Sequence, residues 1–199
     1  MKDQDQGKYR PLSYFQLMEV SLRELLVEKG IVTEEQVAAT VEDMRSRSPE
    51  RGAKVVARAW FDGSFKKKLL ENGSRACEEL GLDVPALNLV VVENTPAAHN
   101  MVVCTLCSCY PRMLLGIPPD WYKSRNYRSR AVREPRAVLS EFGLELSREI
   151  KIRVHDSTAD MRYLVLPMRP AGTESWSESR LASIVTRDCM IGVAVPMPI

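Results

Sequence analysis

Residues 103 to 110 read Val103-Cys104-Thr105-Leu106-Cys107-Ser108-Cys109-Tyr110 and hold three of the five cysteines in the chain. The apolar run Met101-Val102-Val103 comes just before the cysteines and is typical of a strand. A loop that starts at the end of a strand is held by a rigid sheet, which suits a site that needs fixed geometry. The stretch therefore predicts a cysteine-based site carried by a sheet.

The segment Cys107-Ser108-Cys109 is an unusual chelating sequence. Its two sulfurs and the backbone nitrogens of Ser108 and Cys109 can close adjoining chelate rings around one metal in a planar N2S2 arrangement. Cys104 can add a third thiolate and leave the sixth position open, as in catalytic rather than structural sites. Amide nitrogens must lose a proton to bind, and thiolates favour transition metals, so trivalent iron or cobalt fits best.

Spacing alone also leaves open a structural zinc site, an iron–sulfur cluster and a disulfide. A structural zinc site needs four ligands and would have to recruit distant residues. An iron–sulfur cluster needs four cysteines in a longer run. A disulfide between Cys107 and Cys109 would close a very small, strained ring. The distant residues that zinc would need are Cys77, Cys189, His99 and His155.

The cysteine motif resembles that of the α-subunit of nitrile hydratase and of the related metal subunit of thiocyanate hydrolase. The resemblance extends from residue 15 to residue 195 and implies a helical arm that embraces a partner subunit, followed by a layered α-β-β-α metal-binding core. The stretches that carry it include Gly52–Trp60, Glu93–Pro96, Leu115–Ser124, Tyr127–Arg130, Val132–Arg136, Glu141–Gly143, Arg162–Pro167, Arg169–Glu174 and Val185–Asp188.

This resemblance implies an enzyme that hydrates a nitrile to an amide at a cysteine-ligated metal. The implied ligands are the thiolates of Cys104, Cys107 and Cys109 and the backbone nitrogens of Ser108 and Cys109. In the family's active form Cys107 is a sulfinate and Cys109 a sulfenate. Either the Cys109 sulfenate oxygen or a hydroxide attacks the nitrile carbon, so Cys109 and Ser108 are the expected catalytic residues.

The metal and the partners also follow from the resemblance. Members with Thr105 and Tyr110 around the cysteines usually hold a non-corrin cobalt(III) ion, so cobalt is expected, with iron(III) as the alternative. One or two β-type subunits are expected to supply arginines to the oxidised cysteines. An activator protein that delivers the metal is a further expected partner.

Three residues outside the motif are expected to surround the metal loop. By resemblance Asp156 and Asp160 occupy acidic positions that reach the loop by hydrogen bonds, although the family more often has glutamate where Asp160 stands. Arg112 stands where simple-nitrile hydratases commonly have a pocket tryptophan. His155, His99, Cys77 and Cys189 are interpreted as structural residues.

Arg112 is the main reason to consider thiocyanate hydrolysis as an alternative function. Arginine at this place, together with residues 188–196, is closer to thiocyanate hydrolase, which converts thiocyanate to carbonyl sulfide and ammonia. Ser129, Glu134-Pro135 and Glu93–Pro96 instead follow the nitrile hydratase pattern. A nitrile hydratase for a bulkier or polar substrate, such as a nucleoside nitrile, also explains a replaced tryptophan. A metal carrier that is inactive unless docked is the hypothesis from another class.

Composition narrows the range of function classes. The chain has 199 residues, 45% of them hydrophobic and 27% charged, with a net charge of +2, as in an ordinary globular protein. Residues 112–136 hold seven basic and two acidic residues, but such a run is usually a solvated face, and no nucleic-acid partner is expected. No apolar run reaches the ~20 residues of a membrane span, and no signal peptide is recognised, so a cytoplasmic location is expected.

The residue pattern predicts an α+β fold in three parts: a flexible tail over 1–12, a helical region over 13–81 and a metal-binding core over 82–199. Ser13 and the capping box Thr33–Gln36 mark the starts of the first two helices. Further helices are predicted from Pro49 to Trp60, over 64–80, around Trp121, over 132–141 and over 177–185. Strands of a mixed sheet are predicted over 87–92, 101–103, 149–154, 162–166 and 190–195.

Overall fold

The computed structural model describes residues 11–84 and 88–198, so the expected tail over 1–12 and Leu87 fall almost wholly outside the described residues. The chain divides near residue 43 into two compact units. The change of pattern near residue 82 lies inside the second unit. No helix in the described part of the chain is long and apolar enough to span a membrane.

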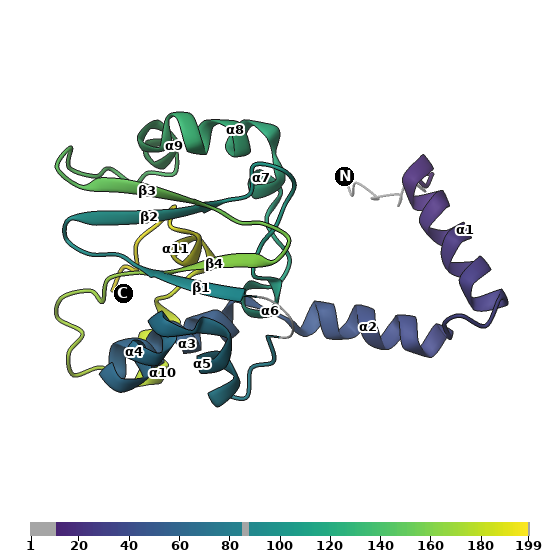
Figure 1. Cartoon of the computed structure of the whole chain (residues 1–199), viewed down its shortest axis with the longest axis horizontal. Coiled ribbons are helices and arrows are strands. Elements are labelled where there is room, and N and C mark those ends of the chain that lie inside the picture. Colours follow the sequence, from purple (N-terminus) through teal and green to yellow (C-terminus); the bar gives the residue numbers. More distant parts are fainter. Residues whose placement is uncertain (1–10, 85–87, 199) are drawn as a thin grey trace, which may run out of the picture. The chain divides into compact units, whose positions relative to one another are not determined.

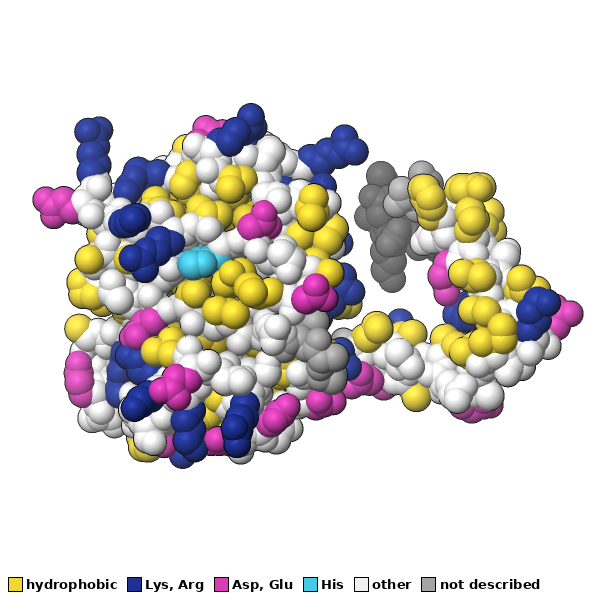
Figure 2. Space-filling view, in the orientation of Figure 1, with side chains coloured by type: hydrophobic (Ala, Val, Ile, Leu, Met, Phe, Trp, Pro, Cys, Tyr) yellow, Lys and Arg dark blue, Asp and Glu magenta, His cyan; other side chains and the backbone are white. Residues whose placement is uncertain are grey.

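Two capped helices open the described part of the chain. Helix α1 (Tyr14–Glu28) begins with a capping box, in which Gln16 N donates to Ser13 Oγ and Ser13 N donates to Gln16 Oε1. Thr33 and Gln36 form the same reciprocal pair before helix α2 (Glu34–Ser46), as the sequence predicts. Neither helix has a buried residue, and hydrophobic side chains gather along one side of α1 (Figure 2).

Four strands in two parallel pairs form the centre of the second unit. Strand β1 (Asn88–Glu93) pairs with β4 (Met161–Leu166), and β2 (Ala98–Val103) pairs with β3 (Lys151–Asp156). In Figure 1 these pairs lie between helices α8 and α9 on one side and helices α3, α4, α5 and α10 on the other. The α+β prediction with a helix-covered core is confirmed, whereas the single mixed sheet is wrong because the structure has two separate parallel pairs.

The helices of the second unit are mostly short. Among the helices within residues 49–84 and 88–198, only α3 exceeds nine residues, and it packs against α10, α4, α6 and α11. The bounds are α3 (Pro49–Phe61), α4 (Gly63–Glu71), α5 (Gly73–Glu79), α6 (Arg112–Leu115), α7 (Asp120–Lys123), α8 (Arg125–Arg133), α9 (Pro135–Glu141), α10 (Glu178–Ser183) and α11 (Arg187–Ile191).

Three predicted elements differ from the structure. The helix predicted over 132–141 is wrong at its start, because α8 ends at Arg133 and α9 begins at Pro135. The helix predicted over 64–80 breaks at Asn72, whose extended backbone ends α4 and whose side chain accepts a hydrogen bond from Arg75 N to begin α5. The strand predicted over 190–195 is wrong, because Thr186 caps helix α11 there and Gly192 ends it with a φ of 88°. A short apolar run does not distinguish a buried helix from a strand.

A buried polar cluster joins the end of α11 to strand β2. Asn94 Oδ1 accepts from Asn100 N at 2.7 Å, and His99 bridges Asn94 Nδ2 and the Gly192 carbonyl oxygen. Burial lowers the pKa of His99, so its neutral form is favoured, with Nε2–H donating to Gly192 O. The cluster therefore fixes the C-terminal segment against the strand that leads into the cysteine loop.

Replacing Gly192 by alanine is expected to destabilise the fold by at least ~3 kcal/mol, the sum of left-handed backbone strain and overpacking. A Cβ there would collide with the carbonyl oxygen of Asn100. Gly172 also has a positive φ of 79° but open space around it, so Gly172→Ala should cost only ~1 kcal/mol. Urea unfolding of both variants checks this; equal costs would contradict the proposed close packing.

Candidate metal centre

Strand β2 delivers the cysteine loop to a defined edge of the core. Its last residue, Val103, pairs in parallel register with Asp156, the last residue of β3, and Ser157 N donates to Val103 O at 2.7 Å. Because the carboxyl ends of parallel strands meet at one edge, the loop after Val103 starts beside Asp156. Cys104, the first residue of the loop, has only 1% of its surface exposed.

The three loop cysteines bring their sulfurs together. Cys107 Sγ lies 3.5 Å from Cys104 Sγ and 3.3 Å from Cys109 Sγ, and all three atoms are within 4.8 Å of one another. These separations are far longer than a disulfide bond, and all five cysteines are free. Among the residues that the structure describes, no fourth side-chain donor completes the cluster, which disfavours a closed four-ligand zinc site.

Side chains from three other elements hold the loop. Asp156 receives two hydrogen bonds from Thr105, at 2.9 Å from its backbone nitrogen and 2.6 Å from its hydroxyl. Arg128 Nη1 donates to the Cys107 carbonyl oxygen at 3.0 Å. Tyr122 donates from its hydroxyl to the Cys109 carbonyl oxygen at 2.8 Å. The loop is thus fixed from β3, α8 and α7 at successive points.

An aromatic cluster packs close to the loop. Tyr122 is fully buried and meets Tyr110 edge to face, with ring centroids 5.1 Å apart. Trp121 packs edge to face on Tyr127 and Phe142. Tyr127 also donates to the Val102 carbonyl oxygen at 2.7 Å, which ties the cluster to β2. Such packing holds the donor hydroxyl of Tyr122 in one position.

The loop thiols differ in protonation. Hydrogen bonds from Cys109, Cys104 and the backbone of Ser108 lower the pKa of exposed Cys107 to about 7. Burial raises the pKa of Cys109 to about 12, although the positive charge of Arg162 opposes this increase. In the chain without metal, Cys107 therefore ionises at a lower pH than Cys109, and a bound cation would favour the thiolate form of both.

The three residues predicted to surround the loop differ in whether they contact it. Asp156 contacts the loop directly through Thr105. Asp160 lies exposed in the turn before β4; its main-chain carbonyl oxygen accepts from Asn88 N, and none of the hydrogen bonds found within 11–84 and 88–198 joins its carboxylate to the loop. Arg112 is exposed at the start of α6, three residues after Cys109.

Two residues that hold the loop, Tyr122 and Arg128, are absent from the expected site. Both lie within stretches that resemble the family, but they are 13 and 21 residues from the loop carbonyls they contact. No local spacing rule connects an arginine on a helix with a carbonyl in a preceding loop. The sequence signal that could have pointed to Arg128 is the basic run over 112–136. In the structure Arg130 of this run pairs with Glu134 and Glu141, whereas Arg128 pairs with neither.

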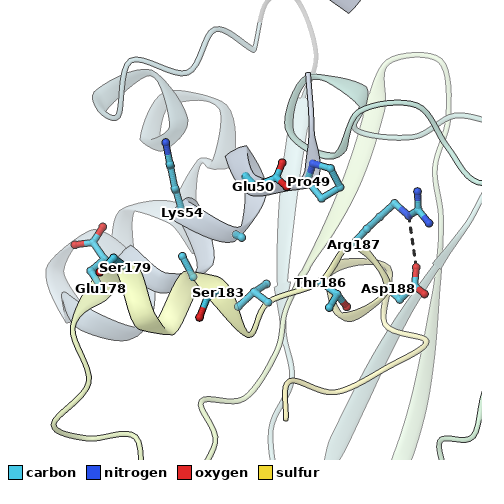
Figure 3. Close-up of a pocket in the computed structure, with 12 residues that line it drawn as sticks. Pro49, Glu50, Lys54, Glu178, Ser179, Ser183, Thr186, Arg187 and Asp188 are labelled. Carbon is cyan, nitrogen blue, oxygen red and sulfur yellow. Dashed lines mark ion pairs between the residues drawn. The ribbon is translucent and has the colours of Figure 1, made fainter. Parts of the chain in front are cut away.

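One hollow has no residue of the cysteine loop in its lining. It has a volume of about 970 Å³ and is formed by α3, α10 and the start of α11, with Lys54, Glu178 and the Arg187–Asp188 ion pair at its wall (Figure 3). A second hollow, of about 620 Å³, adjoins the metal loop and is lined by Thr105, Leu106 and residues of α8. Donor chemistry, rather than size, places the candidate site at the loop.

Alkylation of the chain without metal is expected to begin at Cys107. Its thiol is exposed and about half ionised at pH 7, so its reaction with iodoacetamide should accelerate as pH rises from 6 to 8. Cys77 and Cys189 are buried and should react only after denaturation. Peptide mapping by mass spectrometry gives the rates, with unfolded protein as control. Equal labelling of Cys77 and Cys107 in the folded chain would refute this assignment.

Comparison with known proteins agrees with this geometry. The sequence profile of the family described as "Nitrile hydratase, alpha chain" matches residues 13–194. The low-molecular weight cobalt-containing nitrile hydratase subunit alpha of Rhodococcus rhodochrous is 49% identical over 178 residues, which cover 88% of this chain and 86% of that subunit. Thiocyanate hydrolase subunit gamma of Thiobacillus thioparus is 46% identical, over 94% of this chain and 82% of that subunit.

The fold has the same relatives. The structure of an Fe-type nitrile hydratase double mutant from Comamonas testosteroni Ni1 superposes with a TM-score of 0.88 at 46% identity, covering 94% of this chain and 92% of that chain. Sequence, fold and the cluster of three cysteines therefore agree, and the chain belongs to the nitrile hydratase alpha chain family.

Proposed function

We propose that this chain is the metal-bearing subunit of a nitrile hydratase that adds water to a nitrile to give the amide. The observation that carries the proposal is the cluster of three sulfurs within 4.8 Å, open on one side, in a chain 49% identical to a cobalt-containing nitrile hydratase subunit. Addition of water needs no electron transfer, so a Lewis acid and correctly placed polar groups suffice.

The proposed ligands are the Cys104, Cys107 and Cys109 sulfurs and the backbone nitrogens of Ser108 and Cys109. Five donors of this kind suit trivalent cobalt or iron, and the similarity to cobalt-containing subunits supports cobalt(III) as the proposed ion. When bound, such an ion polarises the nitrile or acidifies a water molecule. Cys104 is buried beneath the cluster, whereas Cys107 is exposed and Cys109 half-buried, so substrate approaches on the side of the last two cysteines.

The same difference in exposure supports the expected modification. Oxygenation by dioxygen or peroxide affects accessible thiolates first, so Cys107 becomes a sulfinate and Cys109 a sulfenate while buried Cys104 stays a thiolate. The added oxygens are acceptors that need donors. Arg112 lies exposed nearby in sequence, and a β-type partner subunit supplies further arginines in this proposal.

The N-terminal helices support a partner subunit. Helix α1 exposes 79% of Phe15, 69% of Tyr14 and 59% of Leu22, and neither α1 nor α2 has a buried residue. Large exposed side chains on one helix face are typical of a protein interface. The β-type subunit is proposed to cover this face, and a separate activator to deliver the metal.

Thiocyanate hydrolysis is the second candidate function. The 46% identity with thiocyanate hydrolase subunit gamma covers 94% of this chain, and Arg112 stands where a tryptophan is common in simple-nitrile hydratases. An exposed arginine at this place suits an anionic substrate better than a neutral nitrile. The two functions share the metal loop and differ in the residues around it.

Metal and product analysis of the chain co-purified with its partner tests the proposal. We expect about one cobalt ion per chain, because the structure has one three-thiolate cluster, and a mass gain of three oxygen atoms. Nitriles should give amides without carbonyl sulfide. Release of carbonyl sulfide and ammonia from thiocyanate would favour the second candidate. Zinc at the same ratio with no added oxygen would contradict both, and full activity of the isolated chain would contradict the role of partner arginines.

Exchange of Asp156 for asparagine is expected to weaken cobalt retention. The variant replaces a carboxylate that holds both the backbone and the hydroxyl of Thr105, and losing such a support typically costs ~10–100-fold in metal affinity. Asp160→Asn is the matched control, because no hydrogen bond found within the described residues joins that carboxylate to the loop, and it should change retention less than ~2-fold. Chelator competition followed by metal analysis gives both values. Equal losses of cobalt affinity in the two variants would show that the contact of Asp156 with Thr105 does not support metal retention.

A further inference from the structure

We propose that Arg128 is a positioning residue for the proposed metal site, which orients the Cys107–Ser108 peptide group and balances the negative charge it carries as a ligand. The inference rests on the ligand set of the proposed function and goes beyond it. It assigns a role in metal retention to a residue of this chain that is itself not a ligand.

The contact falls on a particular peptide group. Arg128 Nη1 lies 3.0 Å from the carbonyl oxygen of Cys107, and this oxygen shares a planar, conjugated peptide unit with the nitrogen of Ser108. When that nitrogen binds a metal as an anion, its charge spreads onto the Cys107 oxygen. A cationic donor at the oxygen therefore stabilises the ligand form more than a neutral donor does.

The other anchors do not act on a ligand peptide in this way. Tyr122 donates to the Cys109 carbonyl, whose peptide nitrogen belongs to Tyr110 and lies outside the proposed ligand set. Asp156 accepts from Thr105 and adds negative charge beside the loop. Arg128 is thus the cation that the described contacts place on a peptide between two ligand sulfurs.

Helix α8 holds Arg128 firmly. Ser124 caps the helix by accepting from Tyr127 N at 3.1 Å, and the Tyr127 hydroxyl donates to Val102 O in the strand before the loop. Within the described residues, no ion pair engages the Arg128 guanidinium, whereas Arg130 pairs with Glu134. The charge of Arg128 is therefore not offset by a carboxylate and stays available to the loop.

The test compares three variants of the subunit co-purified with its partner. Arg128→Gln keeps neutral donors but removes the charge, and Arg128→Lys keeps the charge. Arg125→Gln removes a charge from the same helix and hollow without touching a described loop contact. Cobalt loss to a chelator, the sulfur-to-cobalt charge-transfer band and the urea midpoint of the metal-free chain are measured for each.

We expect Arg128→Gln to lose cobalt at least ~10-fold faster, as for other supports of metal ligands, and to shift the charge-transfer band to higher energy because the peptide nitrogen donates more strongly. Arg128→Lys should restore most of both values, and Arg125→Gln should match the wild type. The inference is wrong if Arg128→Gln matches Arg125→Gln, or if its faster loss comes with an unshifted band and no rescue by lysine. A wild type that binds neither cobalt nor iron overturns the proposed function together with this inference.

Discussion

The parallel pairing of β2 with β3 is the constraint on which the metal loop depends. The register sets Val103 opposite Asp156, so the first residues of the loop meet a carboxylate 51 residues further along the chain. A shift of one residue would turn the Asp156 side chain to the other face and remove both hydrogen bonds to Thr105. The polar cluster around His99 and Gly192 joins β2 to the end of α11 and helps to hold that strand in place.

Positively charged side chains lie beside the negatively charged groups of the loop. Three thiolates on a bound metal, with Asp156 beside them, would make the loop anionic, and Arg128 and Arg162 are two cations of the described residues that act on it. Much of the remaining basic segment is engaged elsewhere, since Arg136 donates to the carbonyls of Leu146, Ser147 and Ile150. Among the described contacts of the basic run, Arg130 and Arg136 therefore have partners outside the loop, whereas Arg128 donates to the loop.

The sequence predicts those features that depend on neighbours in the chain. The three cysteines and the capping boxes at Ser13 and Thr33 are local patterns, and the structure has them as expected. The continuous helical pattern over 64–80 does not reveal the break at Asn72, where the next residue, Gly73, lies so close to Leu89 of β1 that a Cβ would collide with its carbonyl oxygen. The contacts of Tyr122 and Arg128 were missed because they join separate elements, and no periodicity reports such pairs.

The spacing of these contacts also bears on when the site acquires its selectivity. The three thiols lie within six residues, so an unfolded chain already presents them to any thiophilic ion. Their anchors come from 13 to 51 residues away and exist only after non-local strand pairing, a comparatively slow class of folding event. An ion that binds during synthesis is bound by three cysteines of a flexible chain. An ion that binds later is bound by a loop whose geometry is already fixed. For the proposed metal site, the order of folding and metal arrival would therefore influence which ion the chain retains.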